Sequence, residues 1–268
     1  MELNVIHNTD ALTGLAELPS NSINMCVTSP PYFLQRDYET DGQLGMEATI
    51  DEYVSNLCDV FDEVKRVLRD DGTFWLNIGD KYKDKSLLNM PARVSIELQR
   101  RGWILRNAII WQKMNAMPTP AKDRFTIAYE MMYFFTKTKK YVFEQQFEPF
   151  TSDFKTWGWN NHATADVDGH YAMQPKTGSF DGPTTKGRNM RDVWSIPTGT
   201  FRGAHCAVFP ERLIETPIKA GCPEGGTVLD VFMGAGTTAL VAKRLGRNYI
   251  GFEINPDYIK ISEVRLNG

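Results

Sequence analysis

The stretch GTVLDVFMGAGTTA, residues 226–239, decides the fold of this chain of 268 residues. The pattern of residues 226–232 predicts a buried strand, and residues 233–239 continue as a glycine-containing loop that leads into a helix. Glycines let a backbone approach a bound ligand closely, and free N–H groups at a helix start attract an anion. The stretch therefore predicts a ligand-binding loop between a strand and a helix.

A second strand, residues 248–253, brings the carboxylate of Glu253 to its carboxyl end. This side chain can accept hydrogen bonds from both hydroxyls of a ribose, so we expect the ligand to contain a nucleoside. Gly234, Gly236 and Ala239 also fit the dinucleotide fingerprint, and the loop alone does not separate a nicotinamide cofactor from S-adenosylmethionine. Because no Gly-Lys-Ser/Thr follows the glycines, a nucleoside triphosphate site is disfavoured.

The tetrapeptide Ser29-Pro30-Pro31-Tyr32 follows another apolar run, residues 23–28. It fits the methylation of an exocyclic amine, whose lone pair must be drawn out of conjugation before it attacks a methyl donor. Ser29 Oγ and the Pro30 carbonyl can each accept one N–H, Pro31 stiffens the turn without adding a donor, and Tyr32 can stack on the base. An ordinary Pro-Pro loop after a strand is the alternative. Since such a site needs a methyl donor and no hydride carrier, the two motifs together favour S-adenosylmethionine.

With both motifs, the chain resembles the DNA amino-methyltransferases, in the permuted group whose catalytic tetrapeptide precedes the cofactor loop. That family carries Asp/Asn/Ser-Pro-Pro-Tyr/Phe/Trp and a cofactor motif similar to Asp-Pro-Phe-x-Gly-Ser-Gly-Thr-Thr. The chain departs from it at Val231, where Pro is usual, and at Ala235, where Ser is common. The positions that match the cofactor motif are Asp230, Phe232, Gly234, Gly236, Thr237 and Thr238. Residues 45–47, 75–80, 111–113, 192–197 and 205–210 are also similar to the family.

The resemblance implies an α/β fold of the Rossmann-like, doubly wound type, with a mostly parallel sheet of seven strands and one antiparallel strand near the edge. It implies Ser29, Pro30, Pro31 and Tyr32 as catalytic residues. The residues expected around S-adenosylmethionine are Asp10, Thr28, His205, Phe209, Pro210, Asp230, Phe232, Gly234, Ala235, Gly236, Thr237, Thr238, Glu253 and Asn255.

Four of the polar candidates have an alternative structural interpretation. Asp10 is expected to reach the adenine amine or to cap a short helix. His205 is expected to position the methionine end of the cofactor or to be a structural histidine. Asp80 and Lys113 either line the base pocket or are polar residues at strand ends.

The resemblance also implies a division of the chain. Residues 1–144 are expected to form the catalytic half, 145–204 a target-recognition insertion, and 205–268 the cofactor-binding half of the same domain. Between residues 145 and 201 the regular pattern fails, and long irregular segments are usually functional or disordered. A plain surface insertion is the alternative. Basic side chains that could contact phosphates there are Lys155, Lys176, Lys186, Arg188 and Arg191, nearly balanced by Asp153, Asp166, Asp168 and Asp181.

The expected reaction is site-specific methyl transfer to an amine of a base flipped out of double-stranded DNA. Ser29 favours N4 of cytosine, because Ser-Pro-Pro-Tyr is more common among those members of the family. N6 of adenine, RNA or a protein glutamine as substrate, and a catalytically silent DNA-binding module remain alternatives. Methylation at cytosine C5 is disfavoured because it needs a Pro-Cys nucleophile, whereas Cys26 and Cys206 follow Met and His. The recognition sequence, a cognate restriction endonuclease, and the choice between monomer and homodimer stay open.

Composition agrees with one large α/β domain that carries an insertion, at 42% hydrophobic residues. The net charge of −3 requires any DNA affinity to come from local basic patches. Four cysteines and four histidines show no spacing typical of metal ligands, so no metal site or disulfide framework is expected. We expect a cytoplasmic protein, because no leader and no membrane-spanning run is present.

Periodicity predicts the remaining elements. Helices are expected over residues 50–68 and 91–101, with a helical turn at 10–12. Strands are expected over residues 3–7, 73–78, 103–111 and 129–136, and the last is expected to continue through residues 137–140 into a hairpin with 141–143.

Overall fold

The computed structural model describes residues 1–35, 42–149, 187–199 and 209–268. The chain divides into two compact units: unit 1 comprises Met1–Glu144 and Asp192–Gly268, and unit 2 comprises Gln145–Arg191.

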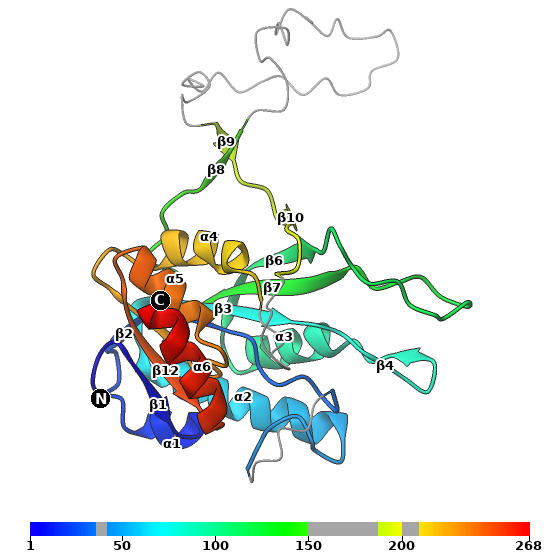
Figure 1. The fold of residues 1–268 in the computed structure, drawn as a ribbon, viewed down its shortest axis with the longest axis horizontal. Coiled ribbons are helices and arrows are strands. Elements are labelled where there is room, and N and C mark those ends of the chain that lie inside the picture. The colour runs from blue at the N-terminus through cyan, green and yellow to red at the C-terminus, as the bar shows by residue number, and fades with distance from the viewer. Residues whose placement is uncertain (36–41, 150–186, 200–208) are drawn as a thin grey trace, which may run out of the picture. The chain divides into compact units, whose positions relative to one another are not determined.

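The described part of unit 1 is built on a sheet of eight strands (Figure 1). Neighbouring strands are parallel except where β7 pairs, because β7 runs antiparallel to both β3 and β6. This confirms the predicted α/β fold with a mainly parallel sheet. The strand order is β1 (Val5–Asn8), β12 (Asn248–Glu253), β11 (Thr227–Asp230), β2 (Ile23–Thr28), β3 (Leu68–Ile78), β7 (Tyr129–Thr136), β6 (Ile104–Gln112) and β10 (Val193–Ser195).

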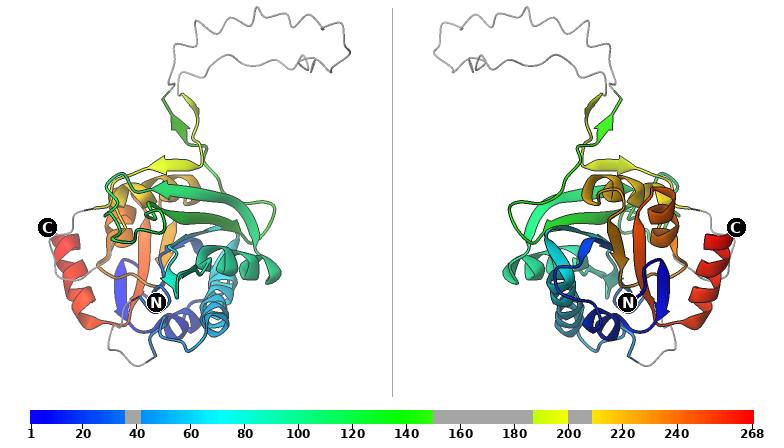
Figure 2. Two further views of the ribbon diagram at one scale, coloured as in Figure 1. Left: turned by 90° about the vertical axis from the view of Figure 1, so that its right-hand side faces the viewer. Right: turned by 90° about the vertical axis from the view of Figure 1, so that its left-hand side faces the viewer.

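Helices cover both faces of this sheet (Figure 2). One layer holds α1 (Ala11–Ala16), α2 (Ile50–Val67) and α3 (Met90–Arg100), and the other holds α4 (Glu211–Gly221), α5 (Thr237–Arg244) and α6 (Pro256–Asn267). Helix α2 begins at a cap in which the Thr49 side chain accepts the N–H of Glu52, and it buries its apolar face against the sheet. A short hairpin, β4 (Tyr82–Lys83) with β5 (Ser86–Leu87), lies between β3 and α3 in the chain.

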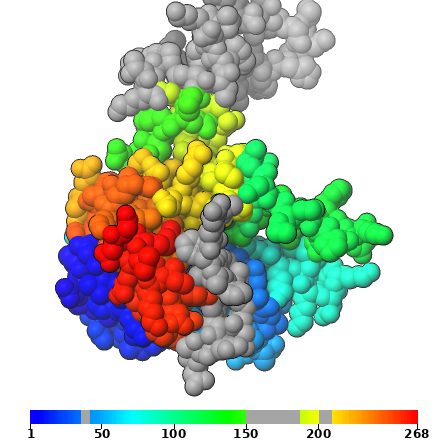
Figure 3. All heavy atoms as spheres, viewed as in Figure 1, coloured from blue at the N-terminus to red at the C-terminus, as the bar shows by residue number. Residues whose placement is uncertain are grey.

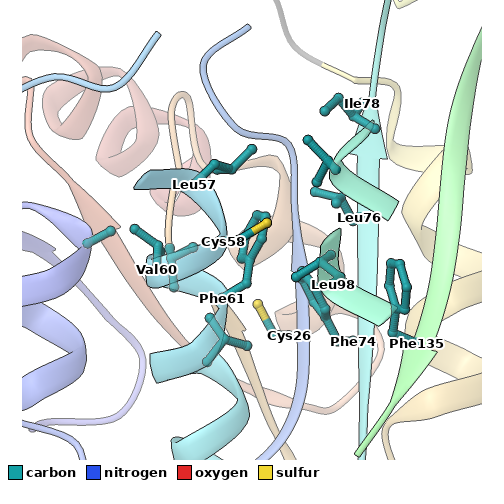
Figure 4. Packing of buried hydrophobic residues seen from close by; sticks show 14 of the residues in the cluster. Cys26, Leu57, Cys58, Val60, Phe61, Phe74, Leu76, Ile78, Leu98 and Phe135 are labelled. Atoms are coloured by element: carbon teal, nitrogen blue, oxygen red, sulfur yellow. The ribbon is translucent and has the colours of Figure 1, made fainter. Parts of the chain in front are cut away.

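The core between the first helix layer and the sheet is dense and aromatic (Figure 4). The Phe61 ring of α2 lies 4.8 Å from the Phe74 ring of β3, measured between centroids, and Phe74 lies 5.9 Å from the Phe135 ring of β7. All three side chains are fully buried. Burying one such side chain stabilises the fold by about 1.5–3 kcal/mol. This packing fixes β3 and β7 against α2, and β3 pairs with β2, whose carboxyl end carries the tetrapeptide.

The sheet order brings the two motifs together. Strand β2, which precedes Ser29, pairs with β11, which precedes the glycine loop, and Met25 and Cys26 lie opposite Val228 and Leu229. Because these strands are parallel, their carboxyl ends meet at the same edge of the sheet. Segments about 200 residues apart in the chain therefore build one site.

Three details of unit 1 differ from the sequence-based expectations. The sheet has eight strands instead of seven, because β10 adds to β6. Strand β3 begins at Leu68 instead of residue 73, because Leu68 pairs with Ile23 before a register shift. The expected hairpin of residues 137–143 is wrong: the edges of β7 are taken by β3 and β6, and the Val142 N–H donates to the Asp71 carbonyl.

Unit 2 is described only near its two ends. There β8 (Phe147–Glu148) pairs antiparallel with β9 (Arg188–Asn189). Glu148 accepts hydrogen bonds from Arg188 at 2.8 Å and from Arg191 at 2.6 Å. Of the basic side chains expected to contact phosphates, these two arginines are described, and Lys155, Lys176 and Lys186 lie outside the described residues. Unit 2 ends at Arg191, because β10 pairs with β6 in the main sheet. The expected target-recognition insertion over residues 145–204 stays a prediction.

Within the described ranges, no helix is both long and apolar enough to span a bilayer. In the same residues, no group of three or more His, Cys, Asp and Glu is placed to hold a metal ion. Cys26, Cys58 and Cys222 are buried free thiols, and Cys206 lies outside the described part.

Candidate active site

A cavity of about 480 Å³ opens at the carboxyl ends of β2 and β11. All four residues of the tetrapeptide, Ser29 to Tyr32, line it, together with the glycine loop after β11. The cavity is therefore the place where the two sequence motifs face each other.

Two contacts hold the tetrapeptide in place, one from Tyr53 and one from the backbone at Gly79. Tyr53 of α2 donates a hydrogen bond to the Pro31 carbonyl at 2.8 Å. A Cβ added to Gly79 would lie 2.8 Å from the Tyr32 ring, so only glycine leaves room for this ring. The Pro30 carbonyl accepts no hydrogen bond from the described residues. The turn thus presents an open acceptor beside a fixed aromatic ring.

A directed chain of hydrogen bonds starts at Ser29. Its hydroxyl donates to Tyr32 Oη at 3.3 Å, and Tyr32 Oη donates to Glu130 Oε2 at 2.8 Å. The other Glu130 oxygen accepts from Lys113 Nζ at 2.5 Å in an ion pair. Each donation toward the carboxylate polarises the oxygen before it, so the Ser29 oxygen becomes a stronger acceptor. Burial, reinforced by the Glu130 charge, raises the pKa of Tyr32 well above its usual range, so the phenol stays protonated as a donor.

Gly234 and Glu253 shape the glycine loop. Gly234 has φ of +54°, and a Cβ added there would meet nothing within 4 Å. Glu253, at the end of β12, accepts the Gly234 N–H with Oε2 and the Asn255 N–H with Oε1, both at 2.8 Å. Glu253 also lines the cavity, so the residue that holds the loop is part of the cavity wall. Burial raises its pKa.

Asp230 has a different position from the one expected. It is 1% exposed and does not line the cavity. Its carboxylate accepts from Thr28 Oγ1 and Thr238 Oγ1, both at 2.5 Å, and from the Phe232 N–H at 3.0 Å. Burial raises its pKa to about 6 despite these donors. Asp230, Thr28 and Thr238 thus tie β2, β11 and α5 together beneath the loop and do not touch the cavity.

Gly236 also serves packing rather than the cavity. Its φ is +77°, and an added Cβ would lie 2.6 Å from the Ser262 Cβ of helix α6. The close approach that this glycine permits is between α5 and α6. Gly236 is not among the residues that line the cavity, and its expected role in cofactor binding stays a prediction.

The remaining candidates divide between the cavity and helix caps. Asp10 does both, because it lines the cavity and its Oδ1 accepts the Thr13 N–H at the start of α1. Pro210 and Asn255 precede α4 and α6 and do not line the cavity. His205 lies outside the described residues. Phe209, Phe232, Ala235 and Thr237 line the cavity.

Of the two strand-end residues, Lys113 lines the cavity and Asp80 does not. Asp80 Oδ1 accepts the Met90 N–H at the start of α3, which is the structural alternative. Glu130 is the residue that sequence reasoning missed. It carries no motif of its own, and only the pairing of β7 with β3 and β6 brings it to Tyr32 and Lys113.

Comparison with known proteins identifies the family. The family model described as DNA methylase matches residues 23–264. The chain belongs to this family. The resemblance drawn from the two motifs is thereby confirmed, and the chain is a DNA methyltransferase of the N4/N6 type.

Individual relatives agree with this assignment. The Type II methyltransferase M.XycI of Xanthomonas campestris pv. cyanopsidis is 38% identical to this DNA methylase, over 97% of this chain and 86% of its own. The PvuII DNA methyltransferase (cytosine-N4-specific) has a similar fold, with a TM-score of 0.73 at 23% identity, covering 97% of this chain and 85% of that one. The M1.HpyAVI–SAM complex shares the fold with a TM-score of 0.60 at 19% identity, covering 98% of both chains.

Proposed function

We propose that this DNA methylase transfers the methyl group of S-adenosylmethionine to the exocyclic N4 of a cytosine flipped out of double-stranded DNA. The observation that carries the proposal is Ser29, a neutral acceptor at the first tetrapeptide position, placed in the cavity at the start of the hydrogen-bond chain to Glu130. N6 of adenine is the alternative product.

The cavity fits the cofactor of this family. Gly234 leaves open space on its ligand side, Glu253 presents a carboxylate with remaining acceptor capacity, and Asp10 lies on the same wall. M1.HpyAVI, which shares the fold, is complexed with SAM. When bound, S-adenosylmethionine supplies an electrophilic methyl group. We assign Glu253 to the ribose hydroxyls and Asp10 to the adenine amine, with Phe209, Phe232, Gly234, Ala235 and Thr237 as the other binding residues.

The tetrapeptide prepares the amine for attack. Ser29 Oγ and the Pro30 carbonyl each accept one N–H of the amine, which draws its lone pair out of the ring. Two preorganised acceptors stabilise the developing pyramidal nitrogen without reorganising at the moment of reaction. Pro31 keeps the turn rigid, and its carbonyl is already occupied by Tyr53.

Extrusion of the base from the duplex is required because a paired amine is stacked and hydrogen-bonded, and it costs a few kcal/mol. The Tyr32 ring, backed by Gly79, offers a stacking surface that offsets part of this cost. We assign target recognition to residues 145–204, of which unit 2 forms the larger part. A cognate endonuclease and a cytoplasmic location stay predictions.

Nucleoside mass spectrometry tests the proposal. Unmethylated bacterial genomic DNA is incubated with the protein and S-adenosylmethionine, digested, and compared with DNA treated with the Ser29→Ala variant. N4-methylcytosine that depends on Ser29 is expected. N6-methyladenine in its place would refute the N4 assignment, and no methylated nucleoside from folded, cofactor-binding protein would support the catalytically silent alternative.

A further inference from the structure

The connection between β6 and β7, residues 113–128, exposes apolar side chains. We call it the β6–β7 loop. Phe125 is 95% exposed, Met117 is 87% exposed and Met114 is 63% exposed. A loop of this length inside a compact unit is usually either functional or disordered. Three large apolar side chains facing water on one loop indicate an interaction surface.

This loop is anchored at both ends. At its start, the Asn115 side chain accepts the Thr198 N–H at 2.7 Å. Near its end, the Arg124 guanidinium lies 3.9 Å from the Tyr82 ring centroid, and Asp123 pairs with Lys85 at 3.4 Å. The β6–β7 loop and the β4–β5 hairpin therefore lie side by side, and in Figure 3 they stand out from the rest of the unit. Phe125 is therefore exposed on a loop that these contacts hold in place.

The same two segments carry positive charge in a chain whose net charge is negative. Residues 81–88 and 113–128 contain six basic and two acidic residues, while the chain carries −3. Lys83, Lys85 and Lys122 are exposed. Exposed cations interspersed with apolar tips match a surface of phosphates and stacked bases.

The β6–β7 loop also starts at the cavity. Lys113, its first residue, lines the cavity, and Thr198, the partner of Asn115, lines it as well. A base seated in the cavity would keep its flanking duplex within reach of this loop. A protein partner with no role in DNA binding would not require a loop that starts at the cavity.

We propose that the β6–β7 loop binds duplex DNA beside the extruded base, with Lys122 and Arg124 on phosphates and Met117 and Phe125 against base steps. The proposal rests on the proposed function, because it takes duplex DNA as the substrate. It adds a DNA-contacting surface within unit 1, on residues of the chain that lie outside the target-recognition segment 145–204. The apolar tips would fill part of the space that the base leaves, as apolar wedges do at other kinked steps.

Binding to a fluorescein-labelled duplex of mixed sequence, followed by anisotropy without cofactor over a series of salt concentrations, tests the loop. Lys122→Gln and Arg124→Gln should each lower the slope of log K against log salt by about 1. Phe125→Ala should weaken binding about tenfold at an unchanged slope, with Phe125→Leu recovering much of the loss. The matched controls lie on α6: Lys260→Gln for the cations and Val264→Ala for the apolar tips, both exposed positions.

Loop variants that bind the duplex like wild type would overturn the inference while leaving the proposed function intact. A change of elution volume on size-exclusion chromatography in Phe125→Ala, without loss of DNA binding, would assign the loop to self-association and also overturn it. Loop-dependent binding together with no methylated nucleoside would instead refute the proposed function alone. Lys122 and Phe125 are exposed, so thermal melting of their variants should stay near that of wild type. Arg124 is half-buried against the Tyr82 ring, so the melting temperature of Arg124→Gln is measured alongside its DNA binding.

Discussion

Tyr32 Oη donates a hydrogen bond to Glu130 Oε2 at 2.8 Å, which joins the turn after β2 to the start of β7. The two residues are 98 positions apart in the chain. Glu130 in turn forms an ion pair with Lys113. The Tyr32 hydroxyl therefore donates to a charged pair and accepts a hydrogen bond from Ser29. The Ser-Pro-Pro-Tyr tetrapeptide is thus electrostatically supported from two neighbouring antiparallel strands, β6 and β7.

This support can be measured by separating the ring from the hydroxyl of Tyr32. Tyr32→Phe keeps the stacking surface and removes the hydrogen-bond chain, so kcat should fall about tenfold with little change in DNA affinity. Tyr32→Ala should weaken DNA capture as well. In a double-mutant cycle, Tyr32→Phe and Glu130→Gln should be non-additive in kcat, because both break one chain. Additive effects would show that Glu130 acts independently of Tyr32.

Ser29→Ala should separate chemistry from cofactor binding. The variant lacks the acceptor that matters most as the amine pyramidalises, and loss of one such contact typically lowers turnover by about 100-fold or more. Calorimetry should give near-normal S-adenosylmethionine affinity, because Ser29 is not part of the glycine loop. Equal turnover of Ser29→Ala and wild type at saturating DNA would eliminate the proposed acceptor role.

Glu253→Gln should weaken S-adenosylmethionine binding by about tenfold or more. Both carboxylate oxygens already accept backbone N–H groups, and an amide would turn its NH₂ toward one of these donors. Calorimetry with the folded variant measures the loss. Glu263→Gln, an exposed site on α6, is the control and should bind like wild type. Unchanged affinity in Glu253→Gln would remove this residue from the cofactor site.

Gly236→Ala should lower the free energy of unfolding by more than Gly246→Ala. Both glycines have positive φ, at +77° and +71°, so both substitutions carry the strain of about 1–2 kcal/mol for a left-handed residue. Only at position 236 does the new Cβ also meet Ser262, at 2.6 Å. Urea denaturation of both variants gives the difference, and equal losses would contradict the assigned packing between α5 and α6.

Asp230 should give stability a pH dependence of unusual sign. Its pKa is raised by burial from 3.8 to about 6, so between these values the folded chain binds more protons than the unfolded chain. Stability should therefore fall as pH rises from about 4 to 6, by roughly 3 kcal/mol at most from this group. Subtracting the unfolding free energy of Asp230→Asn from that of wild type at each pH in this range isolates the contribution of Asp230. A difference that does not change with pH would refute the raised pKa.

Local pattern was enough to predict much of the fold and the rim of the site. Ser-Pro-Pro-Tyr after an apolar run and glycines before a helix start are signals that lie within a few residues. The ends of β2, β11 and β12 follow from them, as does a cavity lined by Ser29, Gly234 and Glu253. The boundaries of β7 were also predicted, because the apolar run of residues 131–135 is rich in strand-forming aromatic residues.

What the sequence did not predict depends on neighbours far apart in the chain. The residues after β7 have a strand-like pattern, yet they form no hairpin, because both edges of β7 are already paired. Asp230 and Gly236 match the cofactor motif, but their side-chain positions face Thr28, Thr238 and Ser262. A sequence motif specifies the residue type at a position, whereas tertiary packing decides whether that residue faces the cavity or the protein interior.

The sequence by itself determined that this chain is an α/β DNA methylase whose tetrapeptide and glycine loop occupy strand ends, because those signals are local in the chain. Only the tertiary structure decided that Tyr32 donates a hydrogen bond to the Glu130–Lys113 ion pair. It also decided that Phe125 is exposed on a loop that begins at the cavity. The physical reason is sheet order: hydrogen bonding between strands that lie up to about 200 residues apart in the chain sets which side chains meet, and no local pattern encodes that pairing.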